Sequence, residues 1–258
     1  IKNYIRSICF CSNDIDIVRS EPSYRRIWID KVVSQLEPVY VELLSRFNRL
    51  LKQRSHFWRS EIFLKDKVSE ILDSFDIQMS LISTRIFRRR RRALSKITPY
   101  VKYWHSHLSK SKEQIGINYL SGIEDIIQEE EEEVISKKIA EQLYKQRSIE
   151  ELTGKCNLGP HRDDIEFLIN DISVRKYGSS GQQRTFILAL KMAELDLLRQ
   201  TFNEPPILIL DDVLAELDIT RQNLLLNSVG KDSQCLISAT HLDKFNQSFL
   251  DSSQIIYL

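Results

Sequence analysis

A short apolar run closed by two carboxylates constrains the fold of this chain more than any other feature. Ile207-Leu208-Ile209-Leu210 follows Pro205-Pro206 and leads directly into Asp211 and Asp212. A continuous apolar run of this length is typical of a parallel strand buried on both faces. The sequence therefore predicts an α/β fold in which both aspartates stand at the carboxyl end of a strand, where open α/β sheets place their ligands.

The two neighbouring carboxylates suggest a cation site. Like charges a few ångströms apart raise each other's pKa unless a cation neutralises them. A magnesium ion that carries nucleotide phosphates is the usual cation at such a place. A structural alternative is that an aspartate between a strand and a helix serves as an N-cap.

A small polar turn about two dozen residues upstream opens a helix. Ser180-Gly181-Gln182-Gln183 fits a capping box with Ser180 as the N-cap, Gly181 as the first helical residue and Gln183 three residues after the cap. Glycine at that position lets a ligand approach the backbone closely. The free N–H groups and positive dipole end of a helix N-terminus suit a phosphate.

The hydrophobic periodicity divides the rest of the chain into helices and strands. Residues 20–112 contain no glycine and repeat apolar residues at helical spacing, with a break expected near Pro38. Beyond the first helices, the patterns predict a helix over about 62–94, a strand over 115–120, an acidic helix over about 124–147, strands over 165–169 and 171–175, a helix over about 220–229 and a strand over 235–239 that ends in Thr240-His241.

Three motifs in order resemble the parts of an ABC-type ATPase head. The Ser-Gly-Gln turn is similar to the signature, the strand with Asp211 and Asp212 to Walker B, and Ala215-Glu216-Leu217-Asp218 to the D-loop. Gly159-Pro160-His161-Arg162-Asp163-Asp164, together with Asp-Asp where transporters carry Asp-Glu, resembles the RecF family of bacterial DNA replication and repair proteins, relatives of SMC and other DNA-repair ABC ATPases. The resemblance is dense over 159–218, clear over 20–54 and thin over about 60–150.

The resemblance implies an architecture. It predicts an α/β fold that is the C-terminal half of an ABC-type P-loop ATPase head with an inserted all-α arm subdomain. Residues 1–19 would be a remnant of the first part of the head. Residues 20–113 would form the helical arm, and residues 114–258 the C-terminal part of the head with signature, Walker B and D-loop.

The same resemblance implies roles for individual residues. Asp211 would bind Mg²⁺, and Asp212 would orient or deprotonate the attacking water, slowly because its side chain is one methylene shorter than glutamate. His241 would be the switch residue at the terminal phosphate, although an ordinary exposed loop histidine is the alternative. The remaining residues act between protomers: Ser179, Ser180, Gly181 and Gln182 would receive the terminal phosphate of ATP bound to the other protomer, and Asp218 would lie along the dimer seam.

The resemblance also implies partners. The family is a weak DNA-dependent ATPase that dimerises on ATP and binds gapped DNA or single-strand/duplex junctions. RecO and RecR would be its partners in loading the recombinase at gaps, in the response to DNA damage and the SOS response. Competing classes are a transporter ATPase, disfavoured by Asp-Asp, and an SMC-like structural ATPase, disfavoured by the short arm.

One expected motif is missing from the sequence. There is no GxxxxGK[ST], the loop that supplies most phosphate contacts in P-loop ATPases. Since the chain begins with Ile1, in sequence that resembles the middle of the family's first domain, we expect a truncated chain whose intact form binds ATP and Mg²⁺. The alternatives are a protein that never had a P-loop, an ATPase-incompetent DNA-binding remnant, or another ABC-type ATPase subunit.

Charge is balanced overall and strongly uneven along the chain. The net charge is +1, yet residues 81–112 hold ten Lys or Arg and no acid, while residues 124–133 hold seven acids. The densest run is Arg88, Arg89, Arg90, Arg91 and Arg92. Its side chains could neutralise DNA phosphates, although at most two or three would touch one duplex because successive helical residues turn by about 100°. A solvated helix face or pairing with the acidic block are the alternatives.

The composition bears on the size of the core and on the cellular location. A chain of 258 residues with 42% hydrophobic residues can bury a sizeable core. It has no run of about 18 apolar residues, and its four cysteines form no CxxC pair. A reducing cytoplasm is the expected location.

Overall fold

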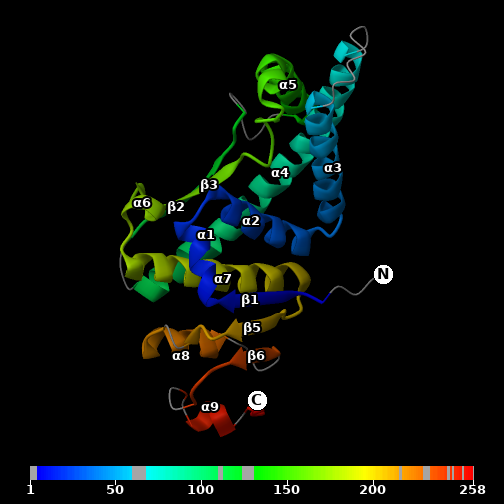
Figure 1. The fold of residues 1–258 in the computed structure, drawn as a ribbon. Helices are drawn as coiled ribbons and strands as arrows, with labels where there is room; N and C mark the ends of the chain where they lie inside the picture. The colour runs from blue at the N-terminus through cyan, green and yellow to red at the C-terminus, as the bar shows by residue number, and fades with distance from the viewer. Residues whose placement is uncertain are drawn as a thin grey trace.

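The computed structural model describes residues 5–59, 68–109, 113–123, 131–214, 217–228, 233–242, 245, 247–251 and 253–257. The molecule is elongated, with a parallel sheet and its helices at one end and a bundle of long helices at the other (Figure 1). No helix in these ranges is both long and apolar enough to cross a bilayer.

The parallel sheet contains the predicted strand. Strands β1 (Ser7–Cys11), β5 (Ile207–Asp211) and β6 (Cys235–Ser238) run parallel in the order β1-β5-β6. Leu208 and Leu210 are buried, whereas Ile207 and Ile209 are half-buried. The prediction of a strand is confirmed, but one face is packed more completely than the other in the described part of the chain.

Helix α7 (Ser180–Phe202) occupies the centre of the molecule. It contacts β1 on one side and the long helix α4 (Val68–Ser109) on the other. Side chains around its whole circumference are buried, from Thr185 to Leu198 with few exceptions, because two layers enclose it. Buried residues from the sheet, from α7 and from the arm form one connected core, so the domain boundaries drawn from the sequence remain a prediction.

The arm consists of helices broken where the sequence indicated. Helix α2 (Pro22–Leu36) ends before Pro38, and α3 (Tyr40–Arg59) begins after it. Helix α4 continues to Ser109, well beyond the predicted end near 94, and passes through Pro99. Pro99 is exposed, so water can solvate the carbonyl that loses its N–H partner. The predicted start of this helix, residues 62–67, lies outside the described residues.

A second, antiparallel sheet joins the arm to the head. Strands β2 (Ile115–Leu120), β3 (Asp164–Ile169) and β4 (Ile172–Ser173) follow one another in that order, and α5 (Glu132–Thr153) connects β2 to β3. The prediction of a strand over 171–175 is wrong beyond Ser173, because α6 (Val174–Tyr177) begins there. Asn170 and Asp171, both at positive φ, make the tight turn between β3 and β4. Residues 124–130 of the predicted acidic helix lie outside the described ranges.

Short helices complete the fold. A 3-10 turn (Ser12–Ile15) and α1 (Asp16–Arg19) follow β1. Helix α8 (Ile219–Ser228) follows β5 and precedes β6 in the sequence, as predicted for 220–229. Helix α9 (Gln247–Asp251) is near the C-terminus. The predicted strand over 235–239 is confirmed as β6, which ends one residue earlier.

Candidate nucleotide site

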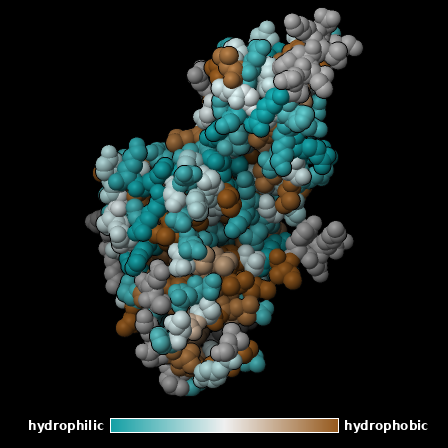
Figure 2. Space-filling model, viewed as in Figure 1, coloured by the Kyte–Doolittle hydropathy of each residue, from teal (hydrophilic) through white to brown (hydrophobic). Residues whose placement is uncertain are grey.

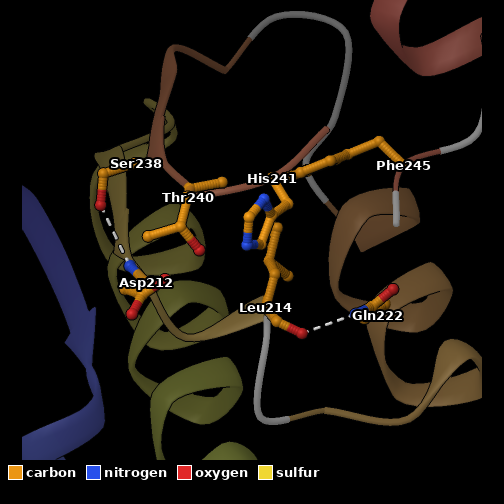
Figure 3. Close-up of a pocket in the computed structure, with 8 residues that line it drawn as sticks. Asp212, Leu214, Gln222, Ser238, Thr240, His241 and Phe245 are labelled. Carbon is orange, nitrogen blue, oxygen red and sulfur yellow. Dashed lines mark hydrogen bonds between the residues drawn. The ribbon is translucent and has the colours of Figure 1, made fainter. Parts of the chain in front are cut away.

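The carboxyl edge of the parallel sheet brings three polar residues into one row. The registers pair Cys11 with Asp211 and Asp211 with Ser238. The Ser238 hydroxyl donates a hydrogen bond of 2.6 Å to Oδ1 of Asp211. It also accepts one of 3.1 Å from the Asp212 backbone N–H (Figure 3). Both aspartates are exposed at this edge. Ser238 therefore orients the pair, and sequence reasoning missed it, although a serine ending an apolar strand beside Walker B was visible.

Neither Asp211 nor Asp212 caps a helix in the described part of the chain. Asp212 has a positive φ of 52°, an uncommon conformation that turns the chain away from the strand. The next described helix, α8, is capped by Asp218, whose Oδ1 accepts a 3.1 Å bond from the Arg221 N–H. Asp218 is therefore the residue that caps α8, while Asp211 and Asp212 are exposed to solvent.

A small hollow lies beside Asp212. It is lined by Asp212, Leu214, Gln222, Ser238, Ala239, Thr240, His241 and Phe245. The ring of His241 stands in it between Thr240 and Leu214 (Figure 3). The hollow is partly open to solvent, and its free volume of about 20 Å³ is roughly the room that one water molecule needs. The structure thus brings His241 to the same edge as the aspartate pair.

Magnesium fits the chemistry of this edge. Among the described residues there is no cluster of three His, Cys, Asp or Glu side chains that could hold a metal by itself. Mg²⁺ in nucleotide sites commonly takes only one or two carboxylates and fills its other positions with phosphate oxygens and water. Asp211, exposed and oriented through one oxygen by Ser238, is a suitable carboxylate for that arrangement.

The signature turn is capped one residue earlier than predicted. Ser179, and not Ser180, is the N-cap of α7: its hydroxyl accepts a 3.2 Å bond from the Gln182 N–H, and its own N–H donates to Oε1 of Gln182 at 2.9 Å. Gly181 is accordingly the second helical residue. The shift occurs because Gln183 is buried, where its side chain accepts from Arg19 at 2.5 Å and donates to the Val174 carbonyl at 3.1 Å.

The capped turn still presents free donors. Ser180 and Gly181 are exposed, and neither their N–H groups nor the Ser180 hydroxyl has a partner among the residues described. A Cβ added at Gly181 would meet nothing closer than Oγ of Ser179 at 3.9 Å. Glu113 accepts a 3.0 Å bond from the Gln182 amide and fixes its orientation. The turn can therefore offer two backbone N–H groups and a hydroxyl to an incoming anion.

Asp218 is linked to the signature helix within the same chain. Arg221 forms an ion pair of 3.1 Å with Asp218 and donates a 2.6 Å bond to Oγ1 of Thr185. The Thr185 hydroxyl in turn donates to the Gly181 carbonyl at 2.8 Å. Ala215 and Glu216, the first residues of the predicted D-loop, lie outside the described part of the chain.

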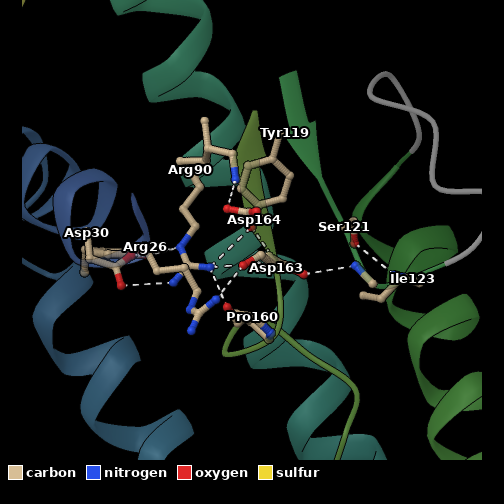
Figure 4. Close-up of polar contacts among 12 residues, drawn as sticks. Arg26, Asp30, Arg90, Tyr119, Ser121, Ile123, Pro160, Asp163 and Asp164 are labelled. Atoms are coloured by element: carbon tan, nitrogen blue, oxygen red, sulfur yellow. Dashed lines mark hydrogen bonds and ion pairs between the residues drawn. The ribbon is translucent and has the colours of Figure 1, made fainter. Parts of the chain in front are cut away.

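The arginine run does not form one surface. Arg90 is 2% exposed, and its guanidinium contacts Asp30, the Pro160 carbonyl and Asp163 (Figure 4). Burial would lower the pKa of Arg90, but Tyr119 and Asp30 outweigh it and place that pKa well above its usual value. The expectation that Arg90 binds DNA is therefore wrong, because a buried and paired side chain cannot reach a phosphate.

The other four arginines lie nearer the surface and also have neighbours. Arg89 and Arg92 pair with Glu37 at 2.9 and 3.1 Å. Arg88 pairs with Glu132 of the acidic block at 3.4 Å, and Arg91 lies over the Phe87 ring at 5.3 Å. The alternative of pairing with the acidic block thus holds for Arg88. The carboxylates that pair with Arg89, Arg90 and Arg92 belong instead to α2 or to Glu37 at its C-terminal end.

The Gly159–Asp164 motif is a structural junction. Tyr119 donates a hydrogen bond to Asp163, and the Asp163 carbonyl accepts one from Arg26 at 2.8 Å (Figure 4). The Asp164 carboxylate pairs with Arg25 at 2.7 Å. Burial raises the pKa of Asp163 despite these partners. The motif fastens α2 and α4 of the arm to β2 and β3.

Comparison with known proteins places these features in a family. No family model matches the chain. The DNA replication and repair protein RecF of Parasynechococcus marenigrum is 50% identical over 253 residues, which are 98% of this chain and 69% of that protein. RecF of Nostoc punctiforme is 44% identical over 259 residues, covering 98% of this chain and 68% of the relative.

Solved structures agree. A recombination mediator protein RecF–ATP structure of the RecFOR pathway superposes with a TM-score of 0.82 at 29% identity, over 93% of this chain and 63% of the solved one. A RecF–ATPrS structure gives a TM-score of 0.83 at 29% identity, over 93% of this chain and 64% of the other. The chain thus spans somewhat less than two thirds of these solved chains. It belongs to the RecF family of DNA replication and repair proteins.

Proposed function

We propose that this protein acts in DNA replication and repair as an ATP-dependent homodimer on gapped DNA or single-strand/duplex junctions, and that this chain supplies the phosphate-sensing side of ATP sites shared between two copies. The observation that carries the proposal is the exposed signature turn, whose donors at Ser180 and Gly181 have no partner among the residues described. An exposed helix N-terminus of this kind is a site for an anion from outside the chain.

The sheet edge would serve the chemistry of the nucleotide. Magnesium held at Asp211 would neutralise phosphate charge in the reaction. Asp212, beside a hollow the size of one water, would orient that water or accept its proton, and His241 would contact the terminal phosphate. The short reach of an aspartate predicts slow turnover. Asp218, tied to the signature helix through Arg221, would lie at the seam between the two copies.

The wider pathway rests on the family. Related RecF proteins are named for DNA replication and repair, and solved ones are placed in the RecFOR pathway. RecO and RecR are accordingly the proposed partners in loading the recombinase at gaps. Arginines 88, 89, 91 and 92 remain candidate DNA contacts within this proposal, but their carboxylate and aromatic neighbours compete with phosphate.

A charge placed at Ser180 tests the shared site. Ser180→Arg in the complete protein should leave nucleotide binding by each monomer unchanged and abolish ATP-dependent dimerisation, measured by light scattering. Ser69→Arg, at an exposed position in the first turn of α4, is the matched control and should dimerise normally. Dimerisation of Ser180→Arg would contradict the shared site, and DNA binding by a complete protein that binds no nucleotide would support the DNA-binding remnant instead.

A further inference from the structure

One face of helix α3 is basic, although its basic residues form no consecutive run in the sequence. Arg46, Arg49, Lys52 and Arg59 are all exposed, as is His56. At 100° per residue the four cations fall within an arc of about 140° on one side of the helix. We call these four residues the α3 basic face; the surface over α3 is mostly hydrophilic in the view of Figure 2.

The cations of this face are far less neutralised than those of α4. Glu42 is the single acid in α3, and it pairs with Arg46 at 2.6 Å with both side chains 61% exposed, an arrangement that is weak and easily screened. Arg49 and Lys52 have no ion-pair partner within the described ranges. In contrast, Arg88, Arg89, Arg90 and Arg92 of α4 each meet a carboxylate.

The opposite face of α3 holds the helix in one orientation. Arg54, fully buried, donates to Asp76 of α4 and to Glu150 of α5. The Trp58 ring N–H donates to the same Glu150 at 2.9 Å, and Phe47 of the same helix is also buried. Because these contacts fix the rotation of α3, the four cations are held outward on a rigid element of about 30 Å.

We propose that the α3 basic face contacts the phosphate backbone of duplex DNA. Arg46, Arg49 and Lys52 rise by about 4.5 Å per step along the axis of α3, which is of the same order as the roughly 3.4 Å of duplex axis per phosphate of one strand. Lysine and arginine contacts of this kind position a duplex without reading its sequence. The inference rests on the proposed role in DNA repair, and it adds a contact surface on α3 to the candidate arginines of α4.

The salt dependence of duplex binding tests this surface. Binding of a 30-base-pair duplex with a single-stranded extension is measured between 50 and 200 mM salt for the wild type, Arg49→Gln/Lys52→Gln and the matched control Lys137→Gln/Lys145→Gln on α5. For the α3 pair, the slope of log K against log[salt] should shrink by about 1.8, since each phosphate contributes roughly 0.9. Its Kd should rise roughly tenfold or more at 100 mM salt. The control, which removes two exposed lysines outside the α3 basic face and outside the α4 arginine run, should keep the wild-type slope.

The outcomes separate the two proposals. Absence of duplex binding by the wild-type protein would contradict the proposed function itself. Wild-type binding with an unchanged slope in Arg49→Gln/Lys52→Gln would overturn the α3 surface alone, and would point to an acidic protein as its partner. Circular dichroism checks that both variants fold, which we expect because all four substituted side chains are exposed.

Discussion

The guanidinium of Arg90 donates to both carboxylate oxygens of Asp30, at 2.8 and 2.9 Å. This bidentate pair joins α4 to α2 in the interior, and the Pro160 carbonyl accepts a further bond at 2.7 Å. An arginine in the middle of the most basic run of the sequence is therefore part of the core. Its neighbours in the run are not equivalent to it, because α4 turns successive side chains to different sides.

Removal of this buried charge should be costly. Arg90→Met leaves Asp30 and the buried Asp163 without their cation, and we expect the free energy of unfolding to fall by about 3–5 kcal/mol. Arg88→Met, in which an exposed side chain loses one contact with Glu132, should cost less than about 1 kcal/mol. Urea denaturation followed by circular dichroism measures both, and equal losses would contradict the structural role of Arg90.

Gly181 should show opposed effects on stability and assembly. Alanine fits there without a clash, since the nearest atom to the added Cβ is 3.9 Å away. Gly181→Ala should therefore raise the melting temperature, in line with a helix propensity gain of up to about 1 kcal/mol. The same methyl group would crowd a phosphate at the turn, so ATP-dependent dimerisation should weaken. A variant that is stabilised and dimerises normally would argue against phosphate contact at this residue.

Ser238 should support the metal site indirectly. Ser238→Ala removes the donor to Asp211 and an acceptor for the Asp212 N–H. Loss of such an orienting group commonly costs about 10- to 100-fold in metal affinity or activity. The expected result is a higher Mg²⁺ requirement for ATP turnover by the complete protein. Ser233→Ala, which removes a hydroxyl bonded to Arg199 just before the same strand, is the control and should leave turnover unchanged.

His105 should make stability depend on pH. Its ring is buried and has no hydrogen-bond partner among the described residues, with Glu113 at 3.7 Å. Burial lowers the pKa of His105, although Glu113 opposes the shift. The unfolded chain then binds a proton more readily, so stability is full above about pH 6.5 and falls as the pH drops below it. His105→Leu should flatten the pH dependence of the free energy of unfolding between pH 7 and 5. Parallel curves for both proteins would contradict this assignment; His161, whose pKa burial also lowers, is present in both.

Local patterns predicted the elements, and long-range contacts decided their details. The apolar run before Asp211 predicted β5, and Pro38 predicted the break between α2 and α3. The cap of α7 was placed one residue late because Ser179 and Ser180 are each followed three residues later by glutamine. Only the burial of Gln183 against Arg19 and Val174 selects Ser179. Likewise, the end of α4 was missed because a proline on an exposed helix face is tolerated.

The sequence alone determined the family and the order of the motifs, since these depend on residue types at fixed spacings along the chain. The sequence could not determine which charged side chains are exposed and which are buried in ion pairs. Arg90 and Arg49 are both arginines on helices. Three carbonyl and carboxylate groups distant in sequence contact Arg90, whereas Arg49 is exposed. Ser238 and Asp211 are likewise 27 residues apart in the sequence, and the register of β5 and β6 places them side by side. Such contacts arise from packing, which only the tertiary structure specifies.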